Sequence, residues 1–147
     1  MPQLVKGGKI AYAWTNISQT GSITVPPKAF RDYRLEPEEI VVLMQGSKRS
    51  GGFSVVPQRN IKDSPLNPLK NKEDVQEDMV HVLNGRLFTV TRLKGGKVNL
   101  PKEALEAFGL EKGDKLLAVR GSRLGPSFIV KGPIKEEALK HQELEEF

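Results

Sequence analysis

The first third of the chain alternates hydrophobic and polar residues in short runs, which clusters of glycine, serine and proline separate. Alternation of this kind, rich in β-branched and aromatic side chains, is typical of strands with one buried face. The pattern predicts strands over 9–17, 22–25, 39–44 and 53–56. Residues 26–35 begin with two prolines and then place Ala29, Phe30 and Tyr33 at helical spacing, which predicts a short helix with one buried side.

The same order of elements returns in the last part of the chain. Strands are predicted over 86–93, 97–100, 115–119 and 128–130. A helix is predicted over 101–108, and Gly109 is suited to end it because glycine readily adopts the left-handed conformation found there. Each half therefore has the predicted order strand, turn, strand, short helix, strand, turn, strand.

A single fixed offset along the chain relates the two halves. Without gaps, residues 21–56 align with 96–131, and nine of these 36 positions are identical. The identical pairs are Gly21/Gly96, Pro26/Pro101, Ala29/Ala104, Leu35/Leu110, Glu36/Glu111, Gly46/Gly121, Ser47/Ser122, Phe53/Phe128 and Val55/Val130. Self-similarity at a fixed period indicates an internal duplication.

The segments outside the repeat differ from it in composition. Residues 57–80 contain three prolines, many polar groups and little periodicity, which indicates a linker. Residues 135–147 are acidic and have a helical pattern. We therefore predict a first copy at 8–56, a linker at 57–80, a second copy at 81–134 and an acidic, helical tail at 135–147.

Charge divides along the same boundaries. Residues 1–56 and 81–134 carry net charges of +3 and +6, whereas 57–80 and 135–147 carry −1 and −3, which together give the net charge of +5. The positive charge lies in the two segments that hold the repeat, as expected if they meet a polyanion. A merely solvated surface is the alternative interpretation of the same charge.

The composition excludes several kinds of site. The chain has no cysteine, and its two histidines, His81 and His141, lack acidic partners at metal-ligand spacing, so we expect no disulfide and no metal site. There is no recognisable catalytic constellation and no cofactor loop, so we expect neither an enzyme nor a cofactor. No run reaches the roughly 18 apolar residues of a membrane span and no secretory signal is evident, so we expect a soluble, cytoplasmic protein that does not bind membranes.

Two stretches, "ISQTGSITVPPKAF" and "GGKVNLPKEALEAFGLEKGDKLLAV", resemble the AbrB/MazE/SpoVT swapped-hairpin family. The resemblance covers both halves, about 100 of the 147 residues. It implies a mainly β fold with short helices, in which two tandem ββαββ copies interleave as a swapped-hairpin β-barrel. Closure of this kind is physically reasonable because an isolated hairpin is marginally stable and leaves its edges open. The repeat would then be a dimer within one polypeptide, although two chains could instead exchange copies.

The resemblance also implies function, because most members of that family bind double-stranded DNA as transcriptional regulators. In them, the turn and strand around the glycine and the start of the helix present basic groups to the duplex. Carried over by position, the implied DNA-binding residues are Ser22, Lys28, Arg31, Arg34, Arg92, Lys94, Lys97 and Lys102. The first copy is basic in its helix and the second in its turn, so we predict an asymmetric DNA element, with longer palindromes if chains form a homodimer.

The connections 45–52 and 120–127 contain glycine, serine and basic residues but lack the spacing of a phosphate-binding loop. We interpret them as hairpin loops, in which Lys48, Arg49 and Arg123 would make secondary contacts to DNA.

Other interpretations remain open from the sequence. The basic residues of 26–35 could form only the solvated face of an amphipathic helix, and Arg92, Lys94 and Lys97 could serve to protect an exposed strand edge. The main functional alternative is an antitoxin-like or adaptor module whose linker or acidic tail binds a partner protein.

Overall fold

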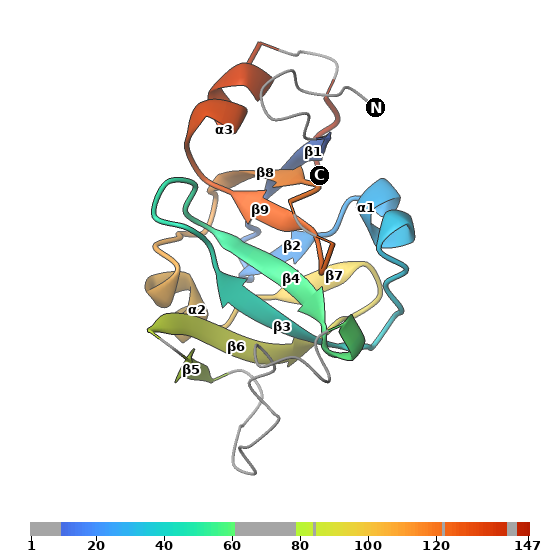
Figure 1. Cartoon of the computed structure of the whole chain (residues 1–147), viewed down its shortest axis with the longest axis vertical. Helices are drawn as coiled ribbons and strands as arrows, with labels where there is room; N and C mark the ends of the chain where they lie inside the picture. The colour runs from blue at the N-terminus through green and yellow to red at the C-terminus, as the bar shows by residue number, and fades with distance from the viewer. Residues whose placement is uncertain (1–9, 61–78, 84, 122, 141–143) are drawn as a thin grey trace.

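The protein is described from a computed structural model in residues 10–60, 79–83, 85–121, 123–140 and 144–147. It is a mainly β protein with short helices (Figure 1). Its elements, in chain order, are β1 (Ala11–Asn16), β2 (Ser22–Thr24), α1 (Pro27–Asp32), β3 (Ile40–Gln45), β4 (Phe53–Pro57), the 3-10 helix η2 (Gln58–Asn60), β5 (Val80–Leu83), β6 (Arg86–Arg92), β7 (Lys97–Asn99), α2 (Lys102–Ala107), β8 (Lys115–Val119), β9 (Ser127–Ile129) and α3 (Pro133–Ala138). No helix in these ranges has the length and apolar character needed to cross a membrane.

The elements recur with the offset found in the sequence. Strands β2 and β7, and helices α1 and α2, are separated by that same offset at both their first and their last residues. Helix α1 begins with Pro27 at its first position, where the missing amide costs no hydrogen bond. Ala29 and its counterpart Ala104 are fully buried, so each helix packs one side against the core and leaves the other in solvent.

Strands β1 and β6 are related by an offset that is longer by a single position. Thr15 of β1 pairs with Leu116 of β8, and Thr91 of β6 pairs with Val41 of β3. The additional residue of the first copy lies in the turn after β1. The structural counterpart of Arg92 is therefore Asn16.

Strands of the two copies interleave in a seven-stranded sheet. Its order is β1-β8-β9-β4-β3-β6-β5, which Figure 1 shows from top to bottom. Hairpin β8–β9 of the second copy lies between β1 and β4 of the first, and hairpin β3–β4 lies between β9 and β6. A second sheet pairs β2 with β7, one strand from each copy. Within the described residues the strands do not close into one hydrogen-bonded barrel, because β1 and β5 end the larger sheet and β2–β7 stays separate.

An approximate two-fold axis relates the copies. Ile23 pairs with Val98 in the small sheet, and Phe53 pairs with Phe128 in the large one; both pairs join residues that the offset of the repeat relates. Each pair is thus its own counterpart and marks a point of the axis. All four side chains belong to the main hydrophobic core between the two sheets. The phenyl rings of Phe53 and Phe128 stack with centroids 5.3 Å apart.

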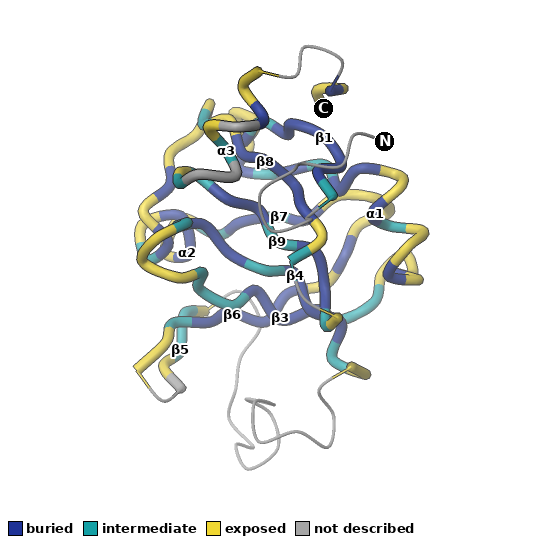
Figure 2. The backbone as a smooth tube through the Cα atoms, turned by 45° about the horizontal axis from the view of Figure 1, so that its top comes forward, coloured by how far each residue is buried: buried dark blue, intermediate teal, exposed yellow. Residues whose placement is uncertain are grey.

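The larger sheet is buried on both faces over much of its width, as the dark strands of Figure 2 show. On β3, Val41 and Leu43 point into the main core, while Val42 joins a smaller cluster on the opposite face. A third cluster places Trp14 with Ala138 of α3 and Leu144 of the tail. Both faces of the central strands are therefore covered. Strands buried in this way have consecutive hydrophobic residues, as β3 does, in place of strict alternation.

The chain's tail and strand β5 cover the outer edges of β1 and β6. Strand β5 pairs antiparallel with β6, and the tail runs parallel to β1 through a Trp14–Glu146 bridge. The amide of Trp14 donates to the carbonyl of Glu145 (2.8 Å), and the amide of Phe147 donates to the carbonyl of Trp14 (2.8 Å). Glu146 also forms an ion pair with Lys115 (2.8 Å).

The predicted linker and tail differ in part from the elements described. Strand β4 includes Pro57, η2 follows it, and β5 begins at Val80, so both ends of the region 57–80 have regular structure. Its middle, 61–78, lies outside the described residues. In the tail, helix α3 ends at Ala138, and residues 144–147 lie along β1 instead of continuing the helix.

Candidate nucleic-acid interface

The small β2–β7 sheet presents a polar outer face contributed by both copies. Ser22 pairs with Asn99, and Thr24 pairs with Lys97. All four are at least partly exposed, whereas Ile23 and Val98 between them are buried. Because successive strand residues point to opposite faces, the alternation that buries the two apolar residues turns the polar ones outward.

The turns at either end of this sheet are held by the opposite copy. The amide of Val25 donates to the carbonyl of Gly96, and the amide of Leu100 donates to the carbonyl of Gly21, both at 2.8 Å. Gly21 has φ 83°, and a Cβ added there would lie 3.1 Å from the Leu100 carbonyl oxygen. Left-handed backbone and this close approach both require glycine at that position.

The second turn brings two predicted lysines together. The amides and carbonyls of Lys94 and Lys97 exchange hydrogen bonds of 2.9 and 3.1 Å around Gly95–Gly96. Both lysines are exposed. In the first copy the equivalent turn carries Ser22, whose hydroxyl oxygen lies 2.9 Å from that of Ser18 and so supports the turn itself.

Helix α1 carries Lys28 and Arg31, both exposed. The ammonium group of Lys28 lies 3.2 Å from Asp32 Oδ1, and the hydroxyl of Tyr12 donates to Asp32 Oδ2 (3.0 Å). Partial burial tends to raise the pKa of Asp32, but the hydrogen bonds from Lys28 and Tyr12 outweigh it and hold that pKa below its ordinary value. Lys28 is therefore partly neutralised, and Arg31 is the freer cation of this helix.

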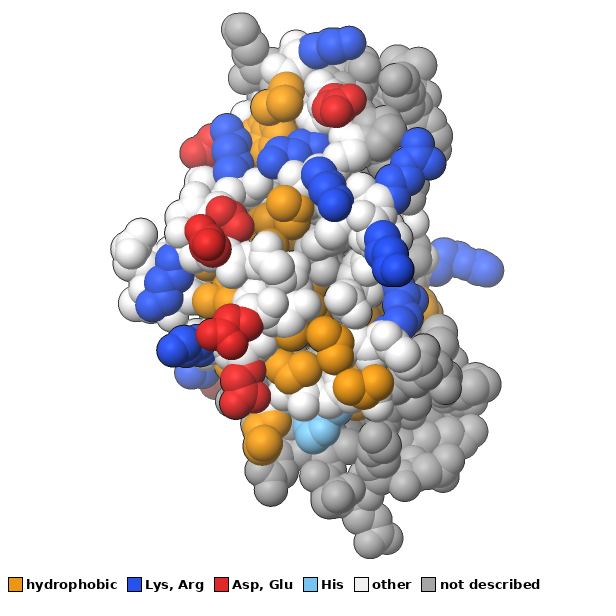
Figure 3. Space-filling model, turned by 90° about the vertical axis from the view of Figure 1, so that its left-hand side faces the viewer, with side chains coloured by type: hydrophobic (Ala, Val, Ile, Leu, Met, Phe, Trp, Pro, Cys, Tyr) orange, Lys and Arg blue, Asp and Glu red, His pale blue; other side chains and the backbone are white. Residues whose placement is uncertain are grey.

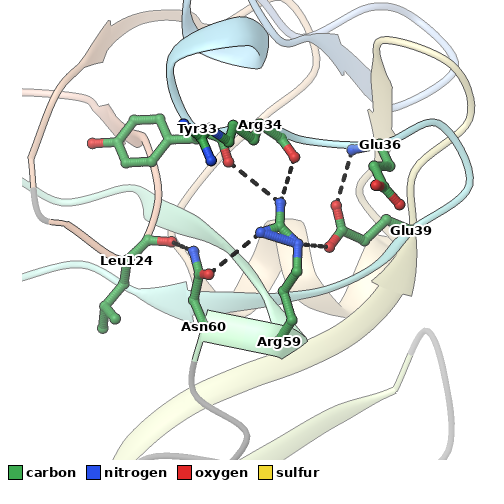
Figure 4. Close-up of polar contacts among 7 residues, drawn as sticks. All are labelled: Tyr33, Arg34, Glu36, Glu39, Arg59, Asn60 and Leu124. Atoms are coloured by element: carbon green, nitrogen blue, oxygen red, sulfur yellow. Dashed lines mark hydrogen bonds and ion pairs between the residues drawn. The ribbon is translucent and has the colours of Figure 1, made fainter.

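The end of α1 is shaped by Arg59 of η2, as Figure 4 shows. Arg34 follows the helix with φ 53°, a left-handed conformation that is unusual for a residue with a Cβ. The guanidinium group of Arg59 donates to the carbonyls of Tyr33 and Arg34, and it forms an ion pair with Glu39 (2.8 Å). Arg34 thus has a structural role in its backbone, while its side chain remains exposed.

Helix α2 offers a weaker cationic surface than α1. Lys102 is exposed at its start, but Glu103 and Glu106 are exposed on the same helix. These carboxylates lower the positive potential around Lys102.

Arg92 lies at the end of β6 and has a partner within the chain. Its Nη1 donates to the carbonyl of Glu38 (3.0 Å), and Glu38 has a left-handed φ of 66°. This hydrogen bond gives Arg92 a role in holding the turn between α1 and β3.

The structure therefore sorts the eight predicted residues by their surroundings. Lys94, Lys97 and Ser22 lie on the small sheet or its turns, whereas Lys28 and Arg92 are each engaged by groups of the first copy. Thr24 shares the outward face of the small sheet but is absent from the predicted set. The signal for it was the strand alternation itself, which places Thr24 on the same face as Ser22.

Comparison with known proteins adds no assignment to this geometry: no family model, no curated protein and no solved structure matches the chain.

Proposed function

We propose that the protein is a double-stranded DNA-binding transcriptional regulator of the AbrB type, a cytoplasmic pseudo-dimer whose copies interleave as a swapped-hairpin barrel. The observation that carries the proposal is the β2–β7 ribbon, whose outward side chains are all polar and come from both copies. The interleaved strand order and the approximate two-fold axis support the architectural part.

A two-stranded antiparallel ribbon has dimensions that fit the major groove of B-DNA. Thr24, Asn99 and Ser22 can donate and accept hydrogen bonds, which is the chemistry that reads base edges. Lys94 and Lys97 supply positive charge at one end of the ribbon, where release of counterions from phosphates would favour binding. Arg31 and Lys102, on helices that lie on opposite sides of the molecule in Figure 1, would contact the flanking backbone.

The ribbon is not symmetric in chemistry. The two-fold axis relates Ser22 to Lys97 and Thr24 to Asn99, so the two ends present different groups. Half-sites read by these ends would differ, which keeps the expectation of one asymmetric DNA element per chain. Longer palindromic sites would require two chains.

The test is binding to a random-sequence duplex pool, and to the sequences enriched from it, over a series of salt concentrations. A phosphate-contacting Lys97 predicts that Lys97→Glu weakens binding about tenfold and lowers the slope of log K against log salt by about 1. Thr24→Ala and Asn99→Ala should instead reduce the preference for the enriched sequences.

Lys135→Glu is the matched control, since it reverses one charge on α3, outside the ribbon. Equal losses in Lys97→Glu and Lys135→Glu would show attraction to net charge and no defined face. A salt slope near zero for the unaltered protein would eliminate DNA as the partner.

A further inference from the structure

A pocket of about 470 Å³ lies between the β3–β4 connection, the start of β6 and the end of α2. Its lining residues are Gln45, Gly46, Ser47, Lys48, Gly51, Gly52, Gly85, Arg86, Phe108 and Lys131. A volume of this size is in the range that holds small organic ligands. The pocket is distinct from the β2–β7 ribbon, with which it shares no residue.

Three cations from separate parts of the chain converge on this pocket. Lys48 comes from the β3–β4 connection, Arg86 from the first position of β6, and Lys131 from the segment after β9. Among the described residues, no carboxylate lies within 4.0 Å of any of the three. Like charges held around one hollow repel each other, and a bound anion would relieve that repulsion.

The surface around this region is correspondingly uneven. Figure 3 faces the side of the molecule on which α2 and the β3–β4 connection lie. Lys and Arg side chains line the right-hand part of this view, whereas toward the left Lys and Arg are mixed with Asp and Glu side chains. An anion that approaches the right-hand part of this surface meets a positive electrostatic potential.

The pocket is built on a tightly folded loop. A Cβ at Gly46 would lie 2.3 Å from the Gly51 carbonyl oxygen, and one at Gly52 would lie 1.9 Å from that of Phe128. Gln45 ties the loop to β6, because its Oε1 accepts the amide of Leu87 (3.1 Å) and its carbonyl accepts Nη2 of Arg86 (3.1 Å). Arg86 is thus positioned before any ligand arrives, which lowers the entropy cost of binding.

One wall of the pocket is apolar and a neighbouring hollow is rich in hydroxyls. Phe108 lines the pocket, and its ring stacks on that of Phe53 with centroids 5.6 Å apart. A second hollow of about 230 Å³ shares Gly46, Ser47, Gly51 and Arg86 with the first and adds further serines, including Ser54 and Ser127. The combination suits a ligand with an anionic group and an apolar or aromatic body.

The residues that line this pocket are not all repeated in the other half of the molecule. At the equivalent place in the other half of the molecule, Val56 replaces Lys131 and Tyr33 replaces Phe108. Lys48 has a basic counterpart, Arg123, and the position that corresponds to Arg86 by strand pairing lies outside the described residues. Lys131 and Phe108 therefore distinguish this pocket from the related position.

We propose that this pocket binds a small phosphorylated organic molecule, with its phosphate oxygens held by Lys48, Arg86 and Lys131 and its body against Phe108. Guanidinium and ammonium donors are the usual protein partners of phosphate. The serine hydroxyls and the polar backbone of the loop supply further hydrogen bonds. This inference is independent of the proposed DNA binding, because the pocket residues lie outside the ribbon. The titrations that test it measure the binding of small molecules.

The test is isothermal titration of the full chain with inorganic pyrophosphate and with adenosine diphosphate. We expect saturable binding of both, tighter for adenosine diphosphate because only it offers an aromatic body to Phe108. Lys131→Glu should weaken both at least tenfold. Arg123→Glu, which reverses one charge at the related position, should leave both within twofold, and circular dichroism checks that both variants fold.

Three outcomes would overturn the proposal. The first is that neither probe binds saturably. The second is an equal loss in Lys131→Glu and Arg123→Glu, which would mean diffuse attraction to a basic surface. The third is that a 20-base-pair duplex loses affinity in Lys131→Glu while pyrophosphate binds the unaltered chain without saturation, because the pocket would then be a contact for the DNA backbone.

Discussion

The two copies follow the same backbone path between helix and strand with different residues. In the first copy, Arg34 and Glu38 adopt left-handed φ values of 53° and 66°. In the second, their counterparts in the repeat are Gly109 and Gly113, with φ values of 70° and 91°. Glycine occupies this region without a steric cost, whereas other residues lose roughly 1–2 kcal/mol there.

In the first copy, two arginines from outside that copy hold this part of the backbone. Arg59 donates to the carbonyl of Arg34, and Arg92 donates to the carbonyl of Glu38. The positions related to these two arginines hold Ile134 and Asn16, and neither can supply a guanidinium group. The same backbone conformation is thus reached with glycine in the second copy and with added hydrogen bonds in the first. The guanidinium groups that donate these hydrogen bonds are used for structure.

The largest expected effect comes from removing Arg59. Arg59→Ala leaves two carbonyls without their charged donor and deprives Glu39, whose side chain is 11% exposed, of its ion-pair partner. We expect the free energy of unfolding to fall by about 2 kcal/mol. Urea unfolding followed by circular dichroism measures this loss. A change smaller than about 0.5 kcal/mol, the range of ordinary surface substitutions, would show that Arg59 does not hold this turn.

Exchange of the residues at the helix ends should have a smaller effect, with opposite signs in the two copies. Gly109→Arg introduces a left-handed arginine without a supporting Arg59, and a Cβ there meets no atom within 4 Å, so only the backbone cost applies. We expect a loss of about 1 kcal/mol.

The reciprocal change, Arg34→Gly, should raise the free energy of unfolding by less than about 1 kcal/mol, because the greater freedom of glycine in the unfolded chain offsets part of the gain. It should also recover part of the stability lost in Arg59→Ala. Loss of stability in Arg34→Gly would contradict the comparison, since it would mean that the Arg34 side chain itself supports the fold.

The smallest expected effect concerns alkaline pH and again separates the copies. The chain has two tyrosines, Tyr12 and Tyr33, and both lie in the first copy. Burial, followed by the hydrogen bond to Asp32, raises the pKa of Tyr12 well above its ordinary value, and burial raises that of Tyr33.

A raised native pKa means that the folded protein holds its phenolic protons more tightly than the unfolded chain. The resulting stability is fully present below the unfolded value of about 10 and is lost as the pH rises above it. Tyr12→Phe should therefore make the decline in stability from pH 10 to 11.5 shallower, as measured by urea unfolding. Phenolate absorbance that titrates near 10 in the folded protein would contradict the expected shifts.

Local patterns predicted the other strands and both helices of the repeat, because alternation, proline and glycine act over a few residues, but they did not predict β5 or the end of α3 at Ala138. The ungapped repeat placed α1 and α2 at the same offset that the structure has. It missed the extra residue in the turn after β1, since only the pairing of β1 with β8 reveals that Thr15 occupies the place equivalent to Thr91.

The site was less predictable because its surroundings depend on distant segments. Nothing in the sequence near Arg92 indicates that its guanidinium group meets Glu38, which lies in the other copy of the repeat. The pocket at Lys48 likewise needs Arg86 of β6 and Lys131 after β9, and these segments become neighbours only through the interleaved strand order. The hairpin loop predicted from the sequence included Lys48, but the sequence did not indicate that Arg86 and Lys131 lie beside it.

The coverage of both outer edges of the repeat has a consequence for assembly. Beyond β6 the large sheet ends in the short strand β5, and beyond β1 it ends in the last residues of the chain. An incoming polypeptide finds few backbone groups with which to prolong the ladder. Two molecules of this protein should accordingly associate through side-chain contacts and not by pairing of strand edges. Edge-to-edge growth into fibrils is disfavoured for the same reason.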